Sequence, residues 1–212
     1  MKTRIAIVDD DDALRDSLGV LLKFREYDVL EFRDGESFLQ DSAAAKLDCL
    51  VLDLKMPGIS GLEVLKTCRE RGYAMPIIVV TAFGDVASAK TALKGGAFDF
   101  VEKPVDWDEM IRLIDEAVAQ YRQANAQDSE RASVEERMAR LSGREREILD
   151  AVLQGKHNRE IAAALGLSVR TVEVYKARMM EKMRVSRLAE LIRLFARLEA
   201  KDAGALAVAQ AP

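Results

Sequence analysis

Three acidic residues follow short apolar runs in the first half of the sequence. Asp9 and Asp10 follow residues 5–8, and Asp53 follows residues 49–52. Uninterrupted apolar runs of this length indicate strands buried on both faces, as in a parallel sheet. Ligands of such sheets bind at the carboxyl ends of the strands. Each acid by itself could simply cap a helix or a turn, but together they could form a reactive site.

Two further expected strands end on groups that suit phosphoryl chemistry. Residues 76–80 lead to Thr81, and residues 98–102 lead to Lys103. Crowded carboxylates repel one another, and Mg²⁺ relieves this repulsion while also binding phosphate oxygens. Asp53 could then attack a phosphoryl group as a nucleophile, with Lys103 and Thr81 contacting the phosphoryl oxygens. Caps and solvated charges explain any one of these strand ends, but they poorly explain four together.

The elements that must position these groups alternate along the first half of the chain. Helices with apolar residues at 3.6-residue spacing separate the apolar runs, and the last of these helices ends near Tyr121. This alternation predicts an α/β fold with a five-stranded doubly wound parallel sheet. The expected strands are residues 4–8, 29–32, 49–52, 76–80 and 98–102.

The composition indicates an ordinary globular protein of 212 residues. No apolar run approaches the ~20 residues of a membrane span, and the first residues lead directly into a strand instead of a signal peptide. Cys49 and Cys68 have no CxxC spacing and are expected to be thiols in the core. A cytoplasmic protein without membrane contact is therefore expected.

Charge is distributed unevenly between the two halves. Residues 1–120 carry 15 basic and 23 acidic side chains, whereas residues 121–212 carry 17 basic and 13 acidic ones. This modest asymmetry suggests a nucleic-acid contact in the second half. Apolar periodicity there predicts four helices, of which the first three are capped by Ser142, Asn158 and Ser168. A short helix, a turn containing Gly and a longer helix form a helix-turn-helix, although helical hairpins without a DNA function share this pattern.

The third of these helices has an apolar side, rich in Met and expected in the core, and a mixed opposite side. On that opposite side, Glu173 could accept from a cytosine amino group, and Val174 and Ala177 could meet thymine methyl groups. Neighbouring basic residues could contact phosphates, and a merely solvated charged face is the alternative. The candidate DNA-contacting residues are Arg170, Thr171, Glu173, Val174, Lys176, Ala177, Arg178 and Lys182.

The motifs of the first half resemble the receiver domain of two-component response regulators. The matching segments are residues 7–10, 53–57, 81–82 and 103–104. The resemblance implies a flavodoxin-like receiver domain over residues 1–122, in which a histidine kinase phosphorylates Asp53. It also implies Mg²⁺ bound by Asp10, Asp53 and the main-chain carbonyl of Lys55, with Asp9 in a supporting role.

The same resemblance implies how phosphorylation is sensed. Thr81 and Phe100 match the switch pair of the family, and the bond between Lys103 and Pro104 is usually cis there. Phe83 offers no hydrogen bond to an attacking water, so slow self-dephosphorylation is expected.

Segments of the second half resemble the LuxR-type helix-turn-helix of the NarL/FixJ class of regulators. They are residues 141–149, 158–162 and 171–175, and the one departure is Tyr175, where members usually have His. The resemblance implies a DNA-binding domain over residues 141–202. Residues 203–212 are expected to form a disordered tail.

Residues 123–140 join the two expected domains. They are rich in Ala, Gln, Glu and Arg and contain neither Pro nor Gly, so they form either a semi-rigid helical spacer or a flexible polar linker.

The leading hypothesis is a response regulator in which phosphorylation controls dimerisation and binding to a DNA operator. It would not be an enzyme beyond forming and losing its own aspartyl phosphate. Its expected partners are a cognate histidine kinase, double-stranded operator DNA, a second copy of the chain and, as a further candidate, RNA polymerase. A phosphatase on the same sheet and an interaction module with an inactive receiver are the rival hypotheses.

Overall fold

The computed structural model describes residues 2–82 and 85–209, with side chains as far as residue 198. The chain divides into two compact units between Asn125 and Ala126.

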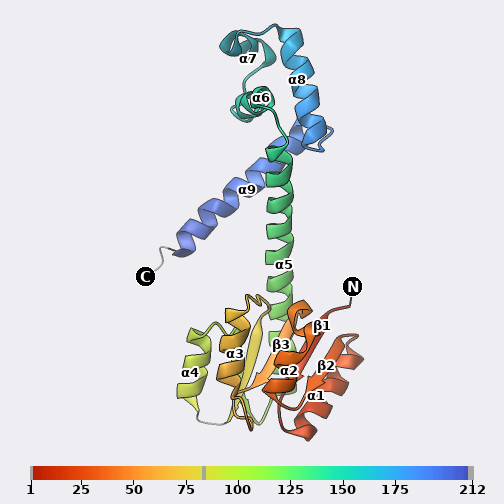
Figure 1. Ribbon diagram of the computed structural model, residues 1–212, viewed down its shortest axis with the longest axis vertical. Coiled ribbons are helices and arrows are strands. Elements are labelled where there is room, and N and C mark those ends of the chain that lie inside the picture. Colours follow the sequence, from red (N-terminus) through yellow and green to blue (C-terminus); the bar gives the residue numbers. More distant parts are fainter. Residues whose placement is uncertain (1, 83–84, 210–212) are drawn as a thin grey trace. The chain divides into compact units, whose positions relative to one another are not determined.

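The first unit contains one parallel sheet with the strand order β2-β1-β3-β4-β5 (Figure 1). This order confirms the predicted five-stranded doubly wound fold. The strands are β1 (Arg4–Val8), β2 (Asp28–Phe32), β3 (Cys49–Asp53), β4 (Ile77–Ala82) and β5 (Asp99–Lys103). The helices that connect them are α1 (Asp12–Phe24), α2 (Gly35–Gln40), the 3₁₀ helix η1 (Ser42–Lys46), α3 (Gly61–Glu70) and α4 (Val86–Lys94).

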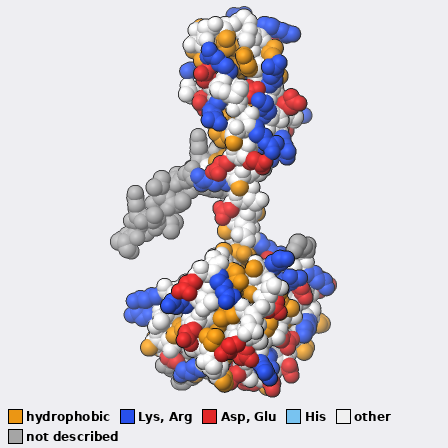
Figure 2. All heavy atoms as spheres, in the orientation of Figure 1, with side chains coloured by type: hydrophobic (Ala, Val, Ile, Leu, Met, Phe, Trp, Pro, Cys, Tyr) orange, Lys and Arg blue, Asp and Glu red, His pale blue; other side chains and the backbone are white. Residues whose placement is uncertain are grey.

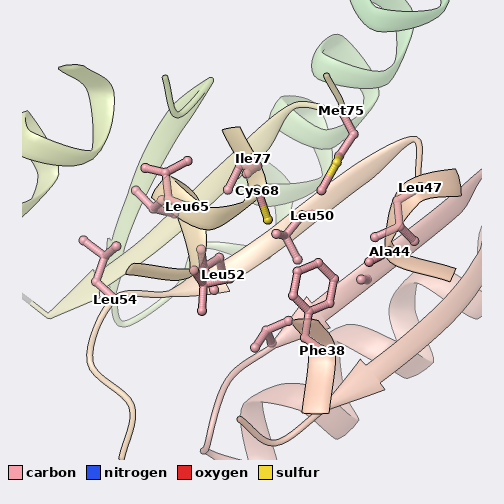
Figure 3. Packing of buried hydrophobic residues seen from close by; sticks show 14 of the residues in the cluster. Phe38, Ala44, Leu47, Leu50, Leu52, Leu54, Leu65, Cys68, Met75 and Ile77 are labelled. Carbon is pink, nitrogen blue, oxygen red and sulfur yellow. The ribbon is translucent and has the colours of Figure 1, made fainter. Parts of the chain in front are cut away.

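An apolar core lies on each face of this sheet. Leu50 of β3 packs in one core with residues of α2, α3 and α4, whereas its neighbour Cys49 packs in the other with α1 and α5. Because side chains alternate along a strand, a strand that is covered on both faces needs an uninterrupted apolar run. Figure 3 shows Phe38 of α2 and Leu65 of α3 in the first core.

The helix α5 (Trp107–Ala139) begins in the first unit and continues beyond Asn125 into the second. Its 33 residues contain neither Pro nor Gly, so no residue in its interior breaks the hydrogen-bond pattern. Of the two alternatives for residues 123–140, the structure has the helical one as far as Ala139.

The second unit is helical, as predicted. It consists of the end of α5 and of α6 (Gly143–Leu153), α7 (Asn158–Leu165), α8 (Val169–Lys182) and α9 (Leu188–Ala209). Ser142 and Ser168 cap α6 and α8 as expected, by accepting hydrogen bonds from the main-chain N–H groups of Glu145 (3.3 Å) and Thr171 (3.0 Å). Gly166 ends α7 in the left-handed region, at φ = 66°.

Two expectations for the second unit need correction. His157, not Asn158, is the N-cap of α7, because its backbone is extended and its carbonyl accepts from the main-chain N–H of Ile161 (3.0 Å). The main-chain N–H of His157 also donates to the Glu160 carboxylate (2.7 Å). The backbone of α9 is helical to Ala209, where a disordered tail was expected from residue 203. Alanine and leucine in residues 203–209 favour helix, and residues 210–212 of the expected tail lie outside the described residues.

Candidate functional site

Three carboxylates converge at the carboxyl end of the sheet. Asp9 follows β1 and Asp53 ends β3, and these two strands are paired neighbours. Asp9, Asp10 and Asp53 each offer an oxygen atom, and these atoms lie within 4.8 Å of one another. Asp9 and Asp53 are only 1% and 3% exposed, whereas Asp10 is exposed. This geometry suits a hard divalent cation, which prefers oxygen ligands.

Lys103, at the end of β5, supplies positive charge to the cluster. Its Nζ atom lies 3.1 Å from Oδ2 of Asp9 and 3.2 Å from Oδ2 of Asp53. Burial, followed by repulsion from Asp9, raises the pKa of Asp53 above its ordinary value, although Lys103 and the main-chain N–H of Lys55 act in the opposite direction. The ammonium group of Lys103 therefore does not fully offset the combined effect of burial and of Asp9 on the pKa of Asp53.

Two buried polar atoms at this edge have no hydrogen-bond partner among the residues that the structure describes. They are Oδ2 of Asp9, which lies 3.1 Å from Nζ of Lys103, and Oγ1 of Thr81. Buried polar atoms in native proteins are rarely left unpaired. The Asp9 oxygen is anionic and can face a cation, whereas the Thr81 hydroxyl can donate to a phosphoryl oxygen. Both atoms therefore fit a site that receives Mg²⁺ and a phosphoryl group.

Gly61 allows the first turn of α3 to lie against the end of β3. A Cβ atom at this position would lie 2.1 Å from the main-chain oxygen of Asp53 and 2.7 Å from Cα of Leu54. These neighbours are backbone atoms that cannot move aside easily, so only glycine fits at this point. Gly61 thus fixes the backbone that carries Asp53.

The predicted switch residues lie on adjacent strands. Thr81 of β4 is fully buried, and Phe100 of β5 is half-buried against the core. The bond between Lys103 and Pro104 is cis, as the resemblance implies. Phe83 lies outside the described residues.

A contact that the sequence does not reveal joins two loops at this edge. Nζ of Lys55, in the loop after β3, lies 3.0 Å from Oδ2 of Asp85, which caps α4. The two residues lie far apart in the chain, and no local motif links them.

In the second unit, α8 presents a mixed surface to solvent. Basic side chains gather along the side of this unit where α8 lies (Figures 1 and 2). Thr171 and Lys176 are half-buried among the candidate DNA-contacting residues. The exposed candidates are Arg170, Glu173, Val174, Ala177 and Arg178.

Lys182, another candidate for DNA contact, has a structural partner. Its Nζ atom lies 2.6 Å from Oε2 of Glu145, which is 3% exposed and also accepts a hydrogen bond from the main-chain N–H of Ser142. Lys182 thus neutralises a buried carboxylate, and we expect its contribution to phosphate contact to be smaller than that of the exposed Arg178.

Two family descriptions match the chain. "Response regulator receiver domain" matches residues 5–115, and "Bacterial regulatory proteins, luxR family" matches residues 139–195. The chain belongs to the family of response regulators that join a receiver domain to a LuxR-type DNA-binding domain.

Regulators named FixJ are similar to this chain along nearly its whole length. The transcriptional regulatory protein FixJ of Azorhizobium caulinodans is 42% identical over 190 residues, which cover 90% of each chain. The solved structure of full-length FixJ from B. japonicum is 39% identical and covers 93% of this chain and 97% of its own, with a TM-score of 0.58. The structure of the response regulator StyR is 30% identical, with a TM-score of 0.80 and coverage of 93% and 100%.

The chain is thus a FixJ-like two-component transcriptional regulator and not a classical enzyme.

Among the helices in the described part of the chain, none combines the length and the apolar composition that crossing a membrane requires.

Proposed function

We propose that Asp53 is the phosphoacceptor of this regulator and that a histidine kinase is the phosphoryl donor. The observation that carries this proposal is the buried Asp53 carboxylate, which lies 3.2 Å from Lys103 within the acid cluster. A carboxylate oxygen of Asp53 attacks phosphorus while the bond from phosphorus to the donor breaks. Lys103 neutralises charge on the phosphoryl group, and the hydroxyl of Thr81 donates to one of its oxygens.

The acid cluster is proposed to hold Mg²⁺. Asp10, Asp53 and the main-chain carbonyl of Lys55 would be the ligands, with Asp9 in a supporting role, and the carboxylates within 4.8 Å of one another support this assignment. When bound, Mg²⁺ supplies positive charge to the phosphoryl oxygens. Asp9 also orders the site, because its Oδ1 accepts a hydrogen bond from the main-chain N–H of Asp11 (2.9 Å).

Phosphorylation is proposed to change the face formed by α4, β5 and α5. The Thr81 hydroxyl would move toward the phosphoryl group, and Phe100 would rotate into the space that Thr81 leaves. Exposed apolar side chains on two of these elements support a role in dimerisation, since Val86 and Leu93 of α4 are 65% and 41% exposed and Trp107 of α5 is 36% exposed.

Dimerisation would bring two copies of α8 to successive major grooves, about one DNA turn apart. Glu173, Val174 and Ala177 are the proposed base-reading residues. Proposed contacts to the DNA backbone come from Arg170, Thr171, Lys176 and Arg178.

RNA polymerase is a further proposed partner, and the cytoplasm is the proposed location.

The hydrolase alternative is less well supported. Hydrolysis of an aspartyl phosphate by such a fold needs a second carboxylate two residues after the nucleophile, and Lys55 occupies that position. The Lys55 side chain instead pairs with Asp85, so it provides no general acid for turnover.

The test is incubation of the full chain with Mg²⁺ and a small phosphodonor such as acetyl phosphate. We expect about one phosphoryl group per chain, lost in Asp53→Asn and kept in Asp12→Asn, which changes an exposed acid at the start of α1. Continuous turnover of the donor would favour the hydrolase. No labelling of the wild type would favour an inactive receiver.

A further inference from the structure

An ion pair connects two loops at the carboxyl end of the sheet. Nζ of Lys55 lies 3.0 Å from Oδ2 of Asp85. Lys55 belongs to the loop between β3 and α3, whereas Asp85 is the N-cap of α4. The pair therefore links the loop beside Asp53 to the start of a helix on a different part of the sheet.

Asp85 is the fixed partner of the pair. Its Oδ1 accepts a hydrogen bond from the main-chain N–H of Ser88 (3.2 Å), and its own main-chain N–H donates to the carbonyl of Ala82 (3.1 Å). The side chain is 18% exposed. Hydrogen bonds from Lys55 and Ser88 hold the pKa of Asp85 below its ordinary value, so its carboxylate is charged at neutral pH.

Lys55 is the partner whose backbone serves the phosphorylation site. Its main-chain N–H lowers the pKa of the nearby Asp53 carboxyl, and its main-chain carbonyl is a proposed metal ligand. The Lys55 side chain is 62% exposed, so without a partner it would sample many rotamers. The ion pair gives this loop an anchor outside the acid cluster.

We propose that Asp85 is a positioning residue for the phosphorylation of Asp53, because its ion pair with Lys55 holds the loop that directly follows the nucleophile and supplies a proposed metal ligand. This inference rests on the proposed roles of Asp53 and Mg²⁺. Asp85 touches none of the reacting atoms and acts only through Lys55.

Positioning and a direct effect of charge predict different changes in Mg²⁺ affinity for two substitutions, Lys55→Gln and Asp85→Asn. If the two charges acted only through space, Lys55→Gln would strengthen Mg²⁺ binding by removing a nearby cation, and Asp85→Asn would weaken it by removing an anion. If the pair positions the loop, both substitutions weaken Mg²⁺ binding. Asn at position 85 keeps an oxygen that accepts from Ser88, so the cap of α4 is retained.

The experiment measures Mg²⁺ affinity by calorimetry on the full chain, together with initial phosphorylation rates by acetyl phosphate at several Mg²⁺ concentrations. Each single substitution should weaken Mg²⁺ binding about 2- to 5-fold, the range expected for an exposed ion pair. The double variant should lose no more than either single one, and Lys55→Arg should bind Mg²⁺ like the wild type. At saturating Mg²⁺ the phosphorylation rates should converge.

Asp34→Asn is the matched control. Asp34 also caps a helix by accepting from a main-chain N–H, that of Ser37 (2.7 Å), and it also pairs with a basic neighbour, Arg33 (3.3 Å). Its substitution should leave Mg²⁺ affinity unchanged.

Three results would overturn the inference. They are effects of opposite sign for Lys55→Gln and Asp85→Asn, additive losses in the double variant, or Mg²⁺ affinities equal to that of the wild type. A wild type that acetyl phosphate does not label at Asp53 would instead overturn the proposed function, so the two failures are distinguishable.

Discussion

At the scale of single residues, the site depends on how closely charges are brought together inside the protein. Asp53 is nearly fully buried, and Lys103 is the one described cation that pairs with it while Asp9 and Asp10 lie close by. Without a metal ion, the native state therefore carries an electrostatic cost at this edge of the sheet. Binding of the proposed Mg²⁺ would relieve that cost.

This cost predicts a pH-dependent effect of Asp53→Asn. The pKa of Asp53 is raised in the native state, mainly by burial and then by Asp9, so its ionisation destabilises the fold as pH rises above the ordinary aspartate value of about 4. In metal-free buffer at pH 7, Asp53→Asn should therefore have a higher free energy of unfolding than the wild type, and the difference should shrink as pH falls toward 4. Denaturant unfolding at several pH values measures this.

Added Mg²⁺ should stabilise the wild type more than Asp53→Asn at pH 7, because binding to the native state raises its stability. A metal-free wild type that is more stable than the variant at pH 7 would contradict the account of crowded charge.

Gly61→Ala should be strongly destabilising. The added Cβ would lie 2.1 Å from the main-chain oxygen of Asp53, and relieving this clash requires the backbone at the end of β3 to move. We expect a loss of about 2–3 kcal/mol in the free energy of unfolding, together with slower phosphorylation. Gly143→Ala is the control, because among the described residues no atom outside its chain neighbours and its own helix backbone lies within 4 Å of the new Cβ, and a change near zero is expected there. Equal effects at both positions would argue against the close approach.

At the scale of elements, α8 has a structural role at some positions and a proposed DNA-binding role at others. Val172, Met179 and Met183, the residue that follows the helix, are fully buried in the core of the second unit. Lys182 pairs with buried Glu145, whereas Arg178 is exposed. Two basic residues of one helix are therefore expected to respond differently to substitution.

Lys182→Met should destabilise the second unit by about 1–2 kcal/mol, because it leaves the Glu145 carboxylate buried without its partner. Lys182 and the bonds from Ser142 lower the pKa of Glu145, so the stabilisation by this group is present at neutral pH and is lost as pH falls through that lowered pKa. Arg178→Met should change stability by less than about 0.5 kcal/mol. Thermal unfolding of the two variants tests this contrast.

Binding to operator DNA should show the reverse order. Arg178→Met should weaken binding and reduce the salt dependence by about one phosphate contact. Lys182→Met should show the same salt dependence of operator binding as the wild type, when binding is measured under conditions in which the variant remains folded. A reduced salt slope for Lys182→Met would restore it to the DNA interface.

At the scale of the whole molecule, regulation requires the phosphorylation site in one unit and the DNA reader in the other to be coupled. Coupling of two binding sites is reciprocal, so a ligand at either site must affect the other by the same factor. Beryllofluoride, a reversible mimic of the phosphoryl group, allows both directions to be measured at equilibrium.

Operator DNA should tighten beryllofluoride binding by the same factor as beryllofluoride tightens operator binding. Calorimetry with and without operator, with scrambled DNA of equal length as the control, provides the measurement. A change in DNA affinity without the reciprocal change in beryllofluoride affinity would mean that the two events are not linked in a single chain or dimer.

Local sequence patterns predicted most of the elements of this protein and suggested the proposed chemistry of its acid cluster. Apolar runs that end on Asp9 and Asp53 predicted strands buried on both faces, and the confirmed strand order brings their carboxyl ends to one edge. Ser142 and Ser168 predicted helix starts correctly because capping depends on residues within one turn. Asn158 was wrongly predicted as a cap, because the helix begins one residue earlier and Asn158 is its first helical residue.

Tertiary structure alone decided which partner each long side chain takes. Lys182 pairs with Glu145, and Lys55 with Asp85, although each pair is widely separated in the sequence. Lysine side chains are long and have many rotamers, so their contacts depend on which elements the fold brings within reach. The separation of 4.8 Å or less among the acids has the same origin, because the pairing of β1 with β3 sets how closely their carboxyl ends approach.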